Sequence, residues 1–255
     1  MAFQPNETVF TPKAPLNKVV KAIWVGKADD VSLRDRNRAM LLTELVFNYG
    51  DTYTVTGENI WSASDGFSDK ILSGLKTSPF ELSVNGKYSN IGIILQPYCY
   101  RVLYEVFHSP DLSLIADILF EHLILADNPR FDIAEKLLVS HFDQWQLDDD
   151  LLKFEKYVSF ELIKKGHLAD FNSLIPISQK SFISKFKKNY LISPSQYIRL
   201  RQVDYAVNQM HQSNDNLTIL GLRAGFYDQS HFIRAFKKFC GVTPSCYKKS
   251  ISKVG

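Results

Sequence analysis

The sequence has little cysteine and no long apolar run. Its 255 residues include three cysteines, Cys99, Cys240 and Cys246, too few and too scattered for a disulfide framework. Cys240 and Cys246, with His231 nearby, lack the spacing of a zinc site, so we expect no metal and no cofactor. No run approaches the ~18 apolar residues of a membrane span, and the opening "MAFQPNETVF" lacks the basic and apolar regions of a signal peptide. These shortages predict a cytoplasmic protein with no membrane partner.

Acidic residues are scarce in the second part of the chain. Residues 1–150 hold 13 Lys and Arg against 21 Asp and Glu, a formal charge of −8, whereas residues 151–255 hold 17 against 6, a charge of +11. Such a division is typical of a protein whose basic part binds a polyanion, most commonly nucleic acid. Charge alone leaves open the alternative that the basic part is merely soluble.

The first ninety or so residues have the pattern of β-strands. The stretch "TELVFNYGDTYTVTG" (43–57) mixes β-branched and aromatic residues with turn formers. In "PFELSVNGKYSNIGIIL" (79–95), Asn85-Gly86 separates two alternating runs, and this dipeptide predicts a tight hairpin turn.

From Pro97 onward the apolar period becomes helical. One stripe consists of Leu112, Ile115, Leu119 and Leu123, and a second helix is expected over 131–142. The stripe could be a homodimer face or could pack on its own sheet, and we favour its own sheet. Asp148, Asp149 and Asp150 predict the start of a helix that ends at Gly166. We therefore place a β-rich regulatory domain with C-terminal helices at 1–147 and a second domain at 148–255.

The second domain contains an internal repeat. A shift of fifty residues aligns "SQKSFISKFKK" (178–188) with "DQSHFIRAFKK" (228–238), and the match resumes at Pro194-Ser195 and Pro244-Ser245. In both copies, a basic-faced helix precedes a helix that begins at proline. Short helices of this kind joined by tight turns are typical of helix-turn-helix units, whose second helix enters the major groove.

The two faces of the second copy differ in chemistry. Phe232, Phe236 and Phe239 lie at i, i+4 and i+7, so they share one helical stripe. The other face carries no acid after Asp228, which is placed to be the N-cap. This face is therefore suited to a negatively charged partner.

The stretch "LTILGLRAGFYDQSHFIRAFKKFCGVTPSCY" (217–247) resembles the signature of the AraC/XylS family of bacterial transcriptional regulators. Its most telling parts are Gly225-Phe226, the run 228–232, the run 236–238 and Thr243-Pro244. The resemblance implies an all-α C-terminal domain of about a hundred residues, with helix-turn-helix units at about 167–190 and 217–240 joined by a long helix over 194–210. The first half is similar to sensor domains of uncharacterised members, through "LVFNYG" (45–50), "ILSGLKTSPFELSVNG" (71–86) and "IGIILQPYCYRVLY" (91–104). The expected fold class is α+β.

The resemblance also implies which residues meet DNA. Position by position, these are Gln179, Lys180, Ile183 and Ser184 in the first unit and Gln229, Ser230, Ile233 and Arg234 in the second. Arginine bonds guanine, glutamine bonds adenine and isoleucine meets a thymine methyl group. Phosphate contacts are expected from Lys187, Lys188, Lys237 and Lys238. Ile183 and Ile233 could instead be core residues, since isoleucine is usually buried.

The chain departs from the family pattern at three positions. Gly221 stands where the family has alanine, which keeps a close helix approach but weakens the helix by ~1 kcal/mol. In the first unit, Asn172 takes the corresponding small position and Pro176 lies near the usual turn glycine. Proline cannot adopt positive φ, so the first turn must be built differently, whereas Gly225 keeps this freedom in the second.

The leading hypothesis is a sequence-specific DNA-binding transcriptional regulator, controlled at its N-terminal domain by a small-molecule effector or a partner. RNA polymerase is expected as a partner if the protein is an activator. Trp24, Trp61, Tyr98 and Tyr100 could line a sugar-like pocket, but we favour core positions for these aromatics. The effector-binding residues are not identified.

Two other classes of function are less favoured by the sequence. An enzyme could use His108, His122 or His141, yet none lies in a known catalytic motif, so we expect no catalytic residues. A protein adaptor could use the helical domain for contacts, but its intact basic faces favour DNA.

Overall fold

The protein is represented by a computed structural model that describes residues 6–142, 147–160, 171, 175–213 and 215–251. The chain divides into two units. The first comprises Met1–Asn37, Leu42–Leu75 and Phe80–Gln146, and the second comprises Arg38–Leu41, Lys76–Pro79 and Leu147–Gly255. Each unit has its own apolar core, one around a β-sheet and one among helices. The predicted α+β class, with a β-rich part before an all-α part, is confirmed.

The first unit is built on a seven-stranded antiparallel sheet in the order β1-β2-β7-β3-β6-β5, with β4 paired to β7. Its strands are β1 (Asn6–Phe10), β2 (Val20–Asn37), β3 (Thr43–Asn48), β4 (Thr52–Thr56), β5 (Ile60–Ser64), β6 (Asp69–Ser73) and β7 (Phe80–Leu95). Every residue of β3 is buried, because both faces of this central strand are covered.

The hairpin predicted at Asn85-Gly86 is wrong. β7 runs straight through both residues, and Asn85 lies opposite Thr52 of β4 and Ser32 of β2. Gly86 does adopt a positive φ of 92°, but it lies beside a register irregularity of the β2–β7 pair. At this place β7 changes its neighbour from β4 to β3. The positive φ therefore serves a bulge inside a long strand, because sheet pairing on both sides keeps the chain extended.

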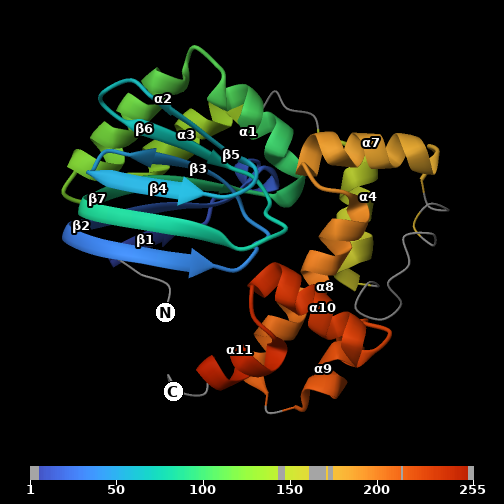
Figure 1. The fold of residues 1–255 in the computed structure, drawn as a ribbon. Helices are drawn as coiled ribbons and strands as arrows, with labels where there is room; N and C mark the ends of the chain where they lie inside the picture. Colours follow the sequence, from blue (N-terminus) through green and yellow to red (C-terminus); the bar gives the residue numbers. More distant parts are fainter. Residues whose placement is uncertain (1–5, 143–146, 161–170, 172–174, 214, 252–255) are drawn as a thin grey trace. The chain divides into compact units, whose positions relative to one another are not determined.

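Three helices cover one face of this sheet (Figure 1): α1 (Tyr100–Phe107), α2 (Leu112–Leu119), which continues as a π-helical segment (Phe120–Leu125), and α3 (Phe131–Phe142). The bounds of α3 match the prediction. All four residues of the predicted stripe are buried within this unit: Leu112, Ile115, Leu119 and Leu123. The stripe therefore packs inside its own unit, and it is not an exposed dimer face.

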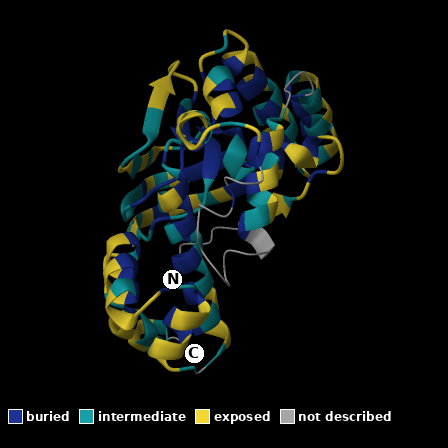
Figure 2. Ribbon diagram, turned by 90° about the vertical axis from the view of Figure 1, so that its right-hand side faces the viewer, coloured by how far each residue is buried: buried dark blue, intermediate teal, exposed yellow. Residues whose placement is uncertain are grey.

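The second unit is helical. Its described helices are α4 (Asp149–Phe160), α7 (Gln179–Tyr190), α8 (Pro194–Gln212), α9 (Leu217–Arg223), α10 (Gln229–Cys240) and α11 (Pro244–Ile251). As predicted, an aspartate precedes α4: Asp148 Oδ1 accepts from the N–H groups of Asp150 and Leu151. The predicted helix end at Gly166 lies outside the described residues. Buried residues follow the inner sides of the helices, and exposed residues the outer sides (Figure 2).

Two short segments of the first half belong to the second unit, which the sequence did not predict. Ala39 is buried in the core that contains Phe239, and its N–H donates to the Phe239 carbonyl at 2.7 Å. Arg38 forms an ion pair with Asp204 of α8 at 2.8 Å. Residues 38–41 therefore complete the packing around the C-terminal end of α10.

Candidate nucleic-acid interface

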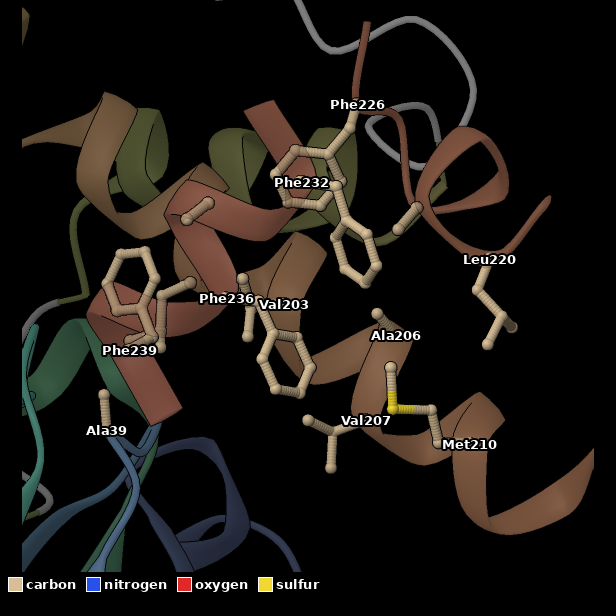
Figure 3. Packing of buried hydrophobic residues seen from close by; sticks show 13 residues of the cluster. Ala39, Val203, Ala206, Val207, Met210, Leu220, Phe226, Phe232, Phe236 and Phe239 are labelled. Carbon is tan, nitrogen blue, oxygen red and sulfur yellow. The ribbon is translucent and has the colours of Figure 1, made fainter. Parts of the chain in front are cut away.

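A stripe of phenylalanines holds α10 in place. Phe232, Phe236 and Phe239 are buried in one cluster with Val203, Ala206 and Val207 of the long helix α8, and Figure 3 shows the ring of Phe236 near Val203 and Val207. In α7 a similar stripe, at i, i+4 and i+8, buries Phe182, Phe186 and Tyr190, which pack with Phe154 and Tyr197. Because one stripe of each helix faces the core, the opposite face of each is left for another molecule.

The outer faces carry the residues predicted to meet DNA. Eleven of them are exposed: Gln179, Lys180, Ser184, Lys187, Lys188, Gln229, Ser230, Ile233, Arg234, Lys237 and Lys238. Ile233 is 36% exposed, so it is not a core residue, while Ile183 is half-buried. The structure thus brings the predicted residues together on two helix faces, and their contacts with bases and phosphates remain predictions.

These faces are electrostatically unbalanced. Neither α7 nor α10 contains an acidic residue. Within the described part of the chain, no ion pair involves Arg234 or the lysines at 180, 187, 188, 237 and 238. Lys185 differs, because Asp148 and Asp150 hold its ammonium group at 2.9 and 2.6 Å. Burial of the ammonium group by itself lowers the pKa of Lys185. The hydrogen bonds and charges of Asp150 and Asp148 outweigh this effect, so the pKa of Lys185 is raised.

The N-termini of both helices are capped by side chains. Asp228 Oδ1 accepts from the His231 N–H at 2.7 Å, and Ser178 Oγ accepts from the Ser181 N–H at 3.2 Å. The predicted N-cap role of Asp228 is confirmed. Because its carboxylate is engaged with the helix backbone, this acid is compatible with a face that meets an anion.

The second helix-turn-helix unit is described completely, from α9 to α10. Gly225 has φ +81°, the conformation predicted for this turn. A Cβ atom on Gly221 would lie 3.0 Å from the ring of Phe232, so the small residue allows the close approach of α9 and α10. In the first unit, Asn172 and part of the atypical turn lie outside the described residues.

Sequence reasoning missed one residue beside this face. Tyr227 is 90% exposed and directly precedes the N-cap of α10. Its phenol can donate a hydrogen bond to a phosphate. The sequence could have indicated this residue, because an aromatic side chain stands between the buried Phe226 and the capping Asp228 without itself belonging to the core.

The first unit contains a cavity of about 370 Å³ between β4 and the β5–β6 pair. It is lined by Tyr53, Thr54, Val55, Thr56, Ile60, Ser62, Ala63, Ser64, Asp69 and Ile71. The lining has hydroxyl groups, apolar side chains and one carboxylate, but neither lysine nor arginine. The four aromatics considered for a sugar-like pocket are not among these residues. Trp24 and Tyr100 are buried, as favoured, whereas Trp61 and Tyr98 are only half-buried.

The described residues also bear on metal binding, membrane spans and two of the three candidate histidines. Among the described His, Cys, Asp and Glu residues, no group of three could hold a metal ion. In the ranges that the structure describes, no helix is long and apolar enough to cross a membrane. His108 and His141 each direct Nδ1 at a carbonyl of their own helix, Tyr104 and Leu137 respectively, at 2.8 Å.

Comparisons with known proteins agree with this geometry. A model described as a helix-turn-helix domain matches residues 174–250, and one for a domain of unknown function, DUF6597, matches residues 8–109. The solved structure of ToxT from Vibrio cholerae shares the fold, with a TM-score of 0.50 and 12% identity over 95% of this chain and 98% of that chain.

The curated relatives are similar to this chain over only part of their length. The chain is 27% identical to the probable transcriptional regulator LumQ of Photobacterium leiognathi, over 54% of this chain and 58% of the relative. It is 29% identical to the raffinose operon regulatory protein RafR of Pediococcus pentosaceus, over 58% and 53%. It is 34% identical to the multiple antibiotic resistance protein MarA of Salmonella typhimurium, over 30% and 65%. The chain thus spans less than two thirds of each of these relatives. The helix-turn-helix match and these similarities support the predicted resemblance of the chain to regulators of the AraC/XylS type.

Proposed function

We propose that this protein is a sequence-specific DNA-binding transcriptional regulator that reads DNA with the outer faces of α7 and α10. One observation carries the proposal. The two equivalent helices bury their aromatic stripes and expose faces that contain no acidic residue. Among the described residues, the basic side chains of these helices form no ion pair, except for Lys185. Such faces suit the phosphates and base edges of a DNA groove.

The roles divide by side-chain chemistry. Arg234 bonds a guanine edge, Gln179 and Gln229 bond adenines, and Ile233 meets a thymine methyl group. The lysines and Tyr227 hold phosphates and so set affinity and register rather than sequence preference. We place the protein in the bacterial cytoplasm and assign it no catalytic role. RNA polymerase would be a partner if the protein activates transcription, and a homodimer remains a prediction.

Selection of bound sites from a random DNA pool tests this function. We expect one preferred sequence, and its binding constant should fall steeply with added salt, with a logarithmic slope of about −0.9 per phosphate contacted. Recovery of no common sequence, or binding that hardly changes between low and physiological salt, would contradict the proposal. A protein with neither property would favour the adaptor function.

The regulatory input is proposed to enter at the cavity of the first unit. Its volume lies in the range of small-molecule sites, and its only charged lining group is the Asp69 carboxylate. We expect it to accept a neutral or cationic molecule and to exclude anions, because an anion would meet Asp69 with no lysine or arginine in the lining to offset the repulsion.

A matched pair of probes tests this expectation. Cyclohexylammonium should raise the melting temperature of the full chain, whereas cyclohexanecarboxylate should not. Asp69→Asn should remove the difference, and Asp29→Asn, at an exposed site of the same unit, should keep it. Stabilisation by the carboxylate alone would show that the cavity prefers anions.

A further inference from the structure

Gln202 is a buried polar side chain in the long helix α8 (3% exposed). Its Nε2 donates to the carbonyl oxygen of Gly225 at 2.9 Å, and its Oε1 accepts from Nη1 of Arg199 at 2.8 Å. Both ends of the amide are therefore engaged, one by the turn between α9 and α10 and the other by a neighbour in α8.

Arg199 reaches the same turn from a second direction. Its guanidinium lies 5.1 Å from the centroid of the Phe226 ring, within the range of a cation–π interaction. Partial burial lowers the pKa of Arg199. Burial and then the charge of Arg199 lower the pKa of His231, in the first turn of α10. The guanidinium thus lies beneath the N-terminal end of the helix proposed to read DNA.

The turn between α9 and α10 needs hydrogen bonds from outside it, because its glycine can adopt many backbone conformations. Gly225 has φ +81°, and a glycine has few steric limits on rotation about its backbone bonds. The Phe226 N–H donates to the Gly221 carbonyl at 3.0 Å, so α9 holds one end of the peptide that joins Gly225 to Phe226. The Gln202 bond to the Gly225 carbonyl holds the other end of the same peptide and so limits the direction in which α10 leaves the turn.

This clamp belongs to one of the two units. The buried apolar residues of α4 and α8 correspond at a shift of forty-nine (Leu151 to Leu200, Phe154 to Val203, Val158 to Val207), which pairs Gln202 with the exposed Lys153. A lysine side chain has no oxygen to accept from an arginine, so it cannot make both hydrogen bonds of Gln202. The first unit is instead held by Glu155, whose Oε1 accepts from the hydroxyl groups of Tyr190 and Tyr197 at 2.6 and 2.7 Å. The fold of such a unit therefore does not require an amide at this position, which points to a task specific to the second unit.

We propose that Gln202, supported by Arg199, is a positioning residue that sets the orientation of α10 and thereby its discrimination between DNA sequences. This inference rests on the proposed DNA-reading function. Base contacts require side chains placed within a fraction of an ångström. Variation in the orientation of α10 would therefore weaken base contacts more than phosphate contacts.

The test compares two identical substitutions in one helix. Gln202→Met keeps the size of the side chain and removes both hydrogen bonds. Gln209→Met makes the same change at a side chain that, among the described residues, bonds only Gln212, at 3.3 Å. The measured quantity is the ratio of affinities for the selected site and for random DNA, at a temperature where both variants are folded. We expect Gln202→Met to lower this ratio about tenfold, the loss of one good base contact, and Gln209→Met to leave it unchanged.

A merely structural role predicts a different result. Loss of stability alone would lower the melting temperature of Gln202→Met and leave the ratio intact, and that outcome would overturn the proposal. Repeating the selection with the variant adds a second readout, because only the base preferences read by α10 should blur. Equal blurring of the bases read by α7 would also overturn it.

Two more variants keep the test decisive. Gln202→Glu can still accept from Arg199 but cannot donate to Gly225, so it should lose discrimination as Gln202→Met does. Full discrimination by this variant would contradict the role of the Gly225 bond.

If Gln202→Met does not fold, Arg199→Met, at a half-buried position, replaces it with the same expectation and the same contradicting outcomes. A wild-type protein that prefers no sequence would refute the proposed function itself, whereas a discriminating wild type with unaffected variants refutes only the role of Gln202.

Discussion

Arg234 and Phe236 lie two residues apart in α10 and face opposite environments. Arg234 is exposed, and Phe236 is fully buried against α8. Arg234→Ala should leave the free energy of unfolding nearly unchanged and weaken the preferred site by ~1–3 kcal/mol, with little loss on random DNA, because it removes a base contact. Phe236→Ala should destabilise the fold by ~3–5 kcal/mol, because it removes a buried ring and leaves a cavity.

Lys238→Ala supplies the comparison for both. It should weaken selected and random DNA alike without unfolding the protein, since a phosphate contact carries no sequence information. One denaturation series and one DNA titration series on the three variants measure all of these effects. If Arg234→Ala loses affinity equally on every sequence, its proposed base-reading role is wrong.

The three cysteines should differ in reactivity. Burial, the largest effect, raises the pKa of the Cys240 thiol to about 12, so it stays protonated at pH 8, where the reactive thiolate would be needed. Cys99 is buried, whereas Cys246 is exposed. Brief treatment of the folded protein with iodoacetamide at pH 8, followed by peptide mass spectrometry, should show alkylation at Cys246 alone. Equal labelling of Cys240 would show that its surroundings open in solution.

At the scale of the element, the start of α10 depends on one cap. Asp228→Ala removes the acceptor for the His231 N–H and should lower the free energy of unfolding by ~0.5–2 kcal/mol. Asp228→Ser keeps a capping oxygen, so most of the stability should return. Thermal melts of the two variants measure the effect. Equal loss in both would mean that the negative charge matters rather than the hydrogen bond.

At the scale of the whole molecule, the second unit includes residues distant in sequence. A fragment of residues 147–255 should fold and bind the selected DNA, because both DNA-reading helices and α8 lie within it. It should be less stable by about 1–2 kcal/mol than the same unit in the full chain, since it lacks the Ala39 hydrogen bond to Phe239 and the Arg38–Asp204 ion pair. Denaturant titration with a fluorescent DNA measures both properties. A folded fragment that does not bind DNA would favour the adaptor function, and a fragment as stable as the intact unit would show that Arg38 and Ala39 contribute nothing.

Features set by local chemistry were determined by the sequence itself. The repeat and the 3.6-residue period place the buried stripes of α7 and α10, and Asp228, Pro194 and Gly225 mark a cap, a helix start and a turn. Each of these signals acts within a few residues of the structure it specifies. The same was true of the helix at Phe131–Phe142.

Features set by distant partners were decided only by the tertiary structure. Asn85-Gly86 has a strong hairpin signal, yet strands on both sides of β7 keep it extended, because their hydrogen bonds outweigh a local turn preference. Ala39 becomes part of the core around α10, and Gln202 becomes a clamp, only because the fold brings residues 39 and 239, and residues 202 and 225, within reach of each other. No periodicity or composition encodes such pairs. Such hydrogen-bonded pairs form when folding buries a polar group beside a partner distant in sequence, because a buried polar group needs a hydrogen bond.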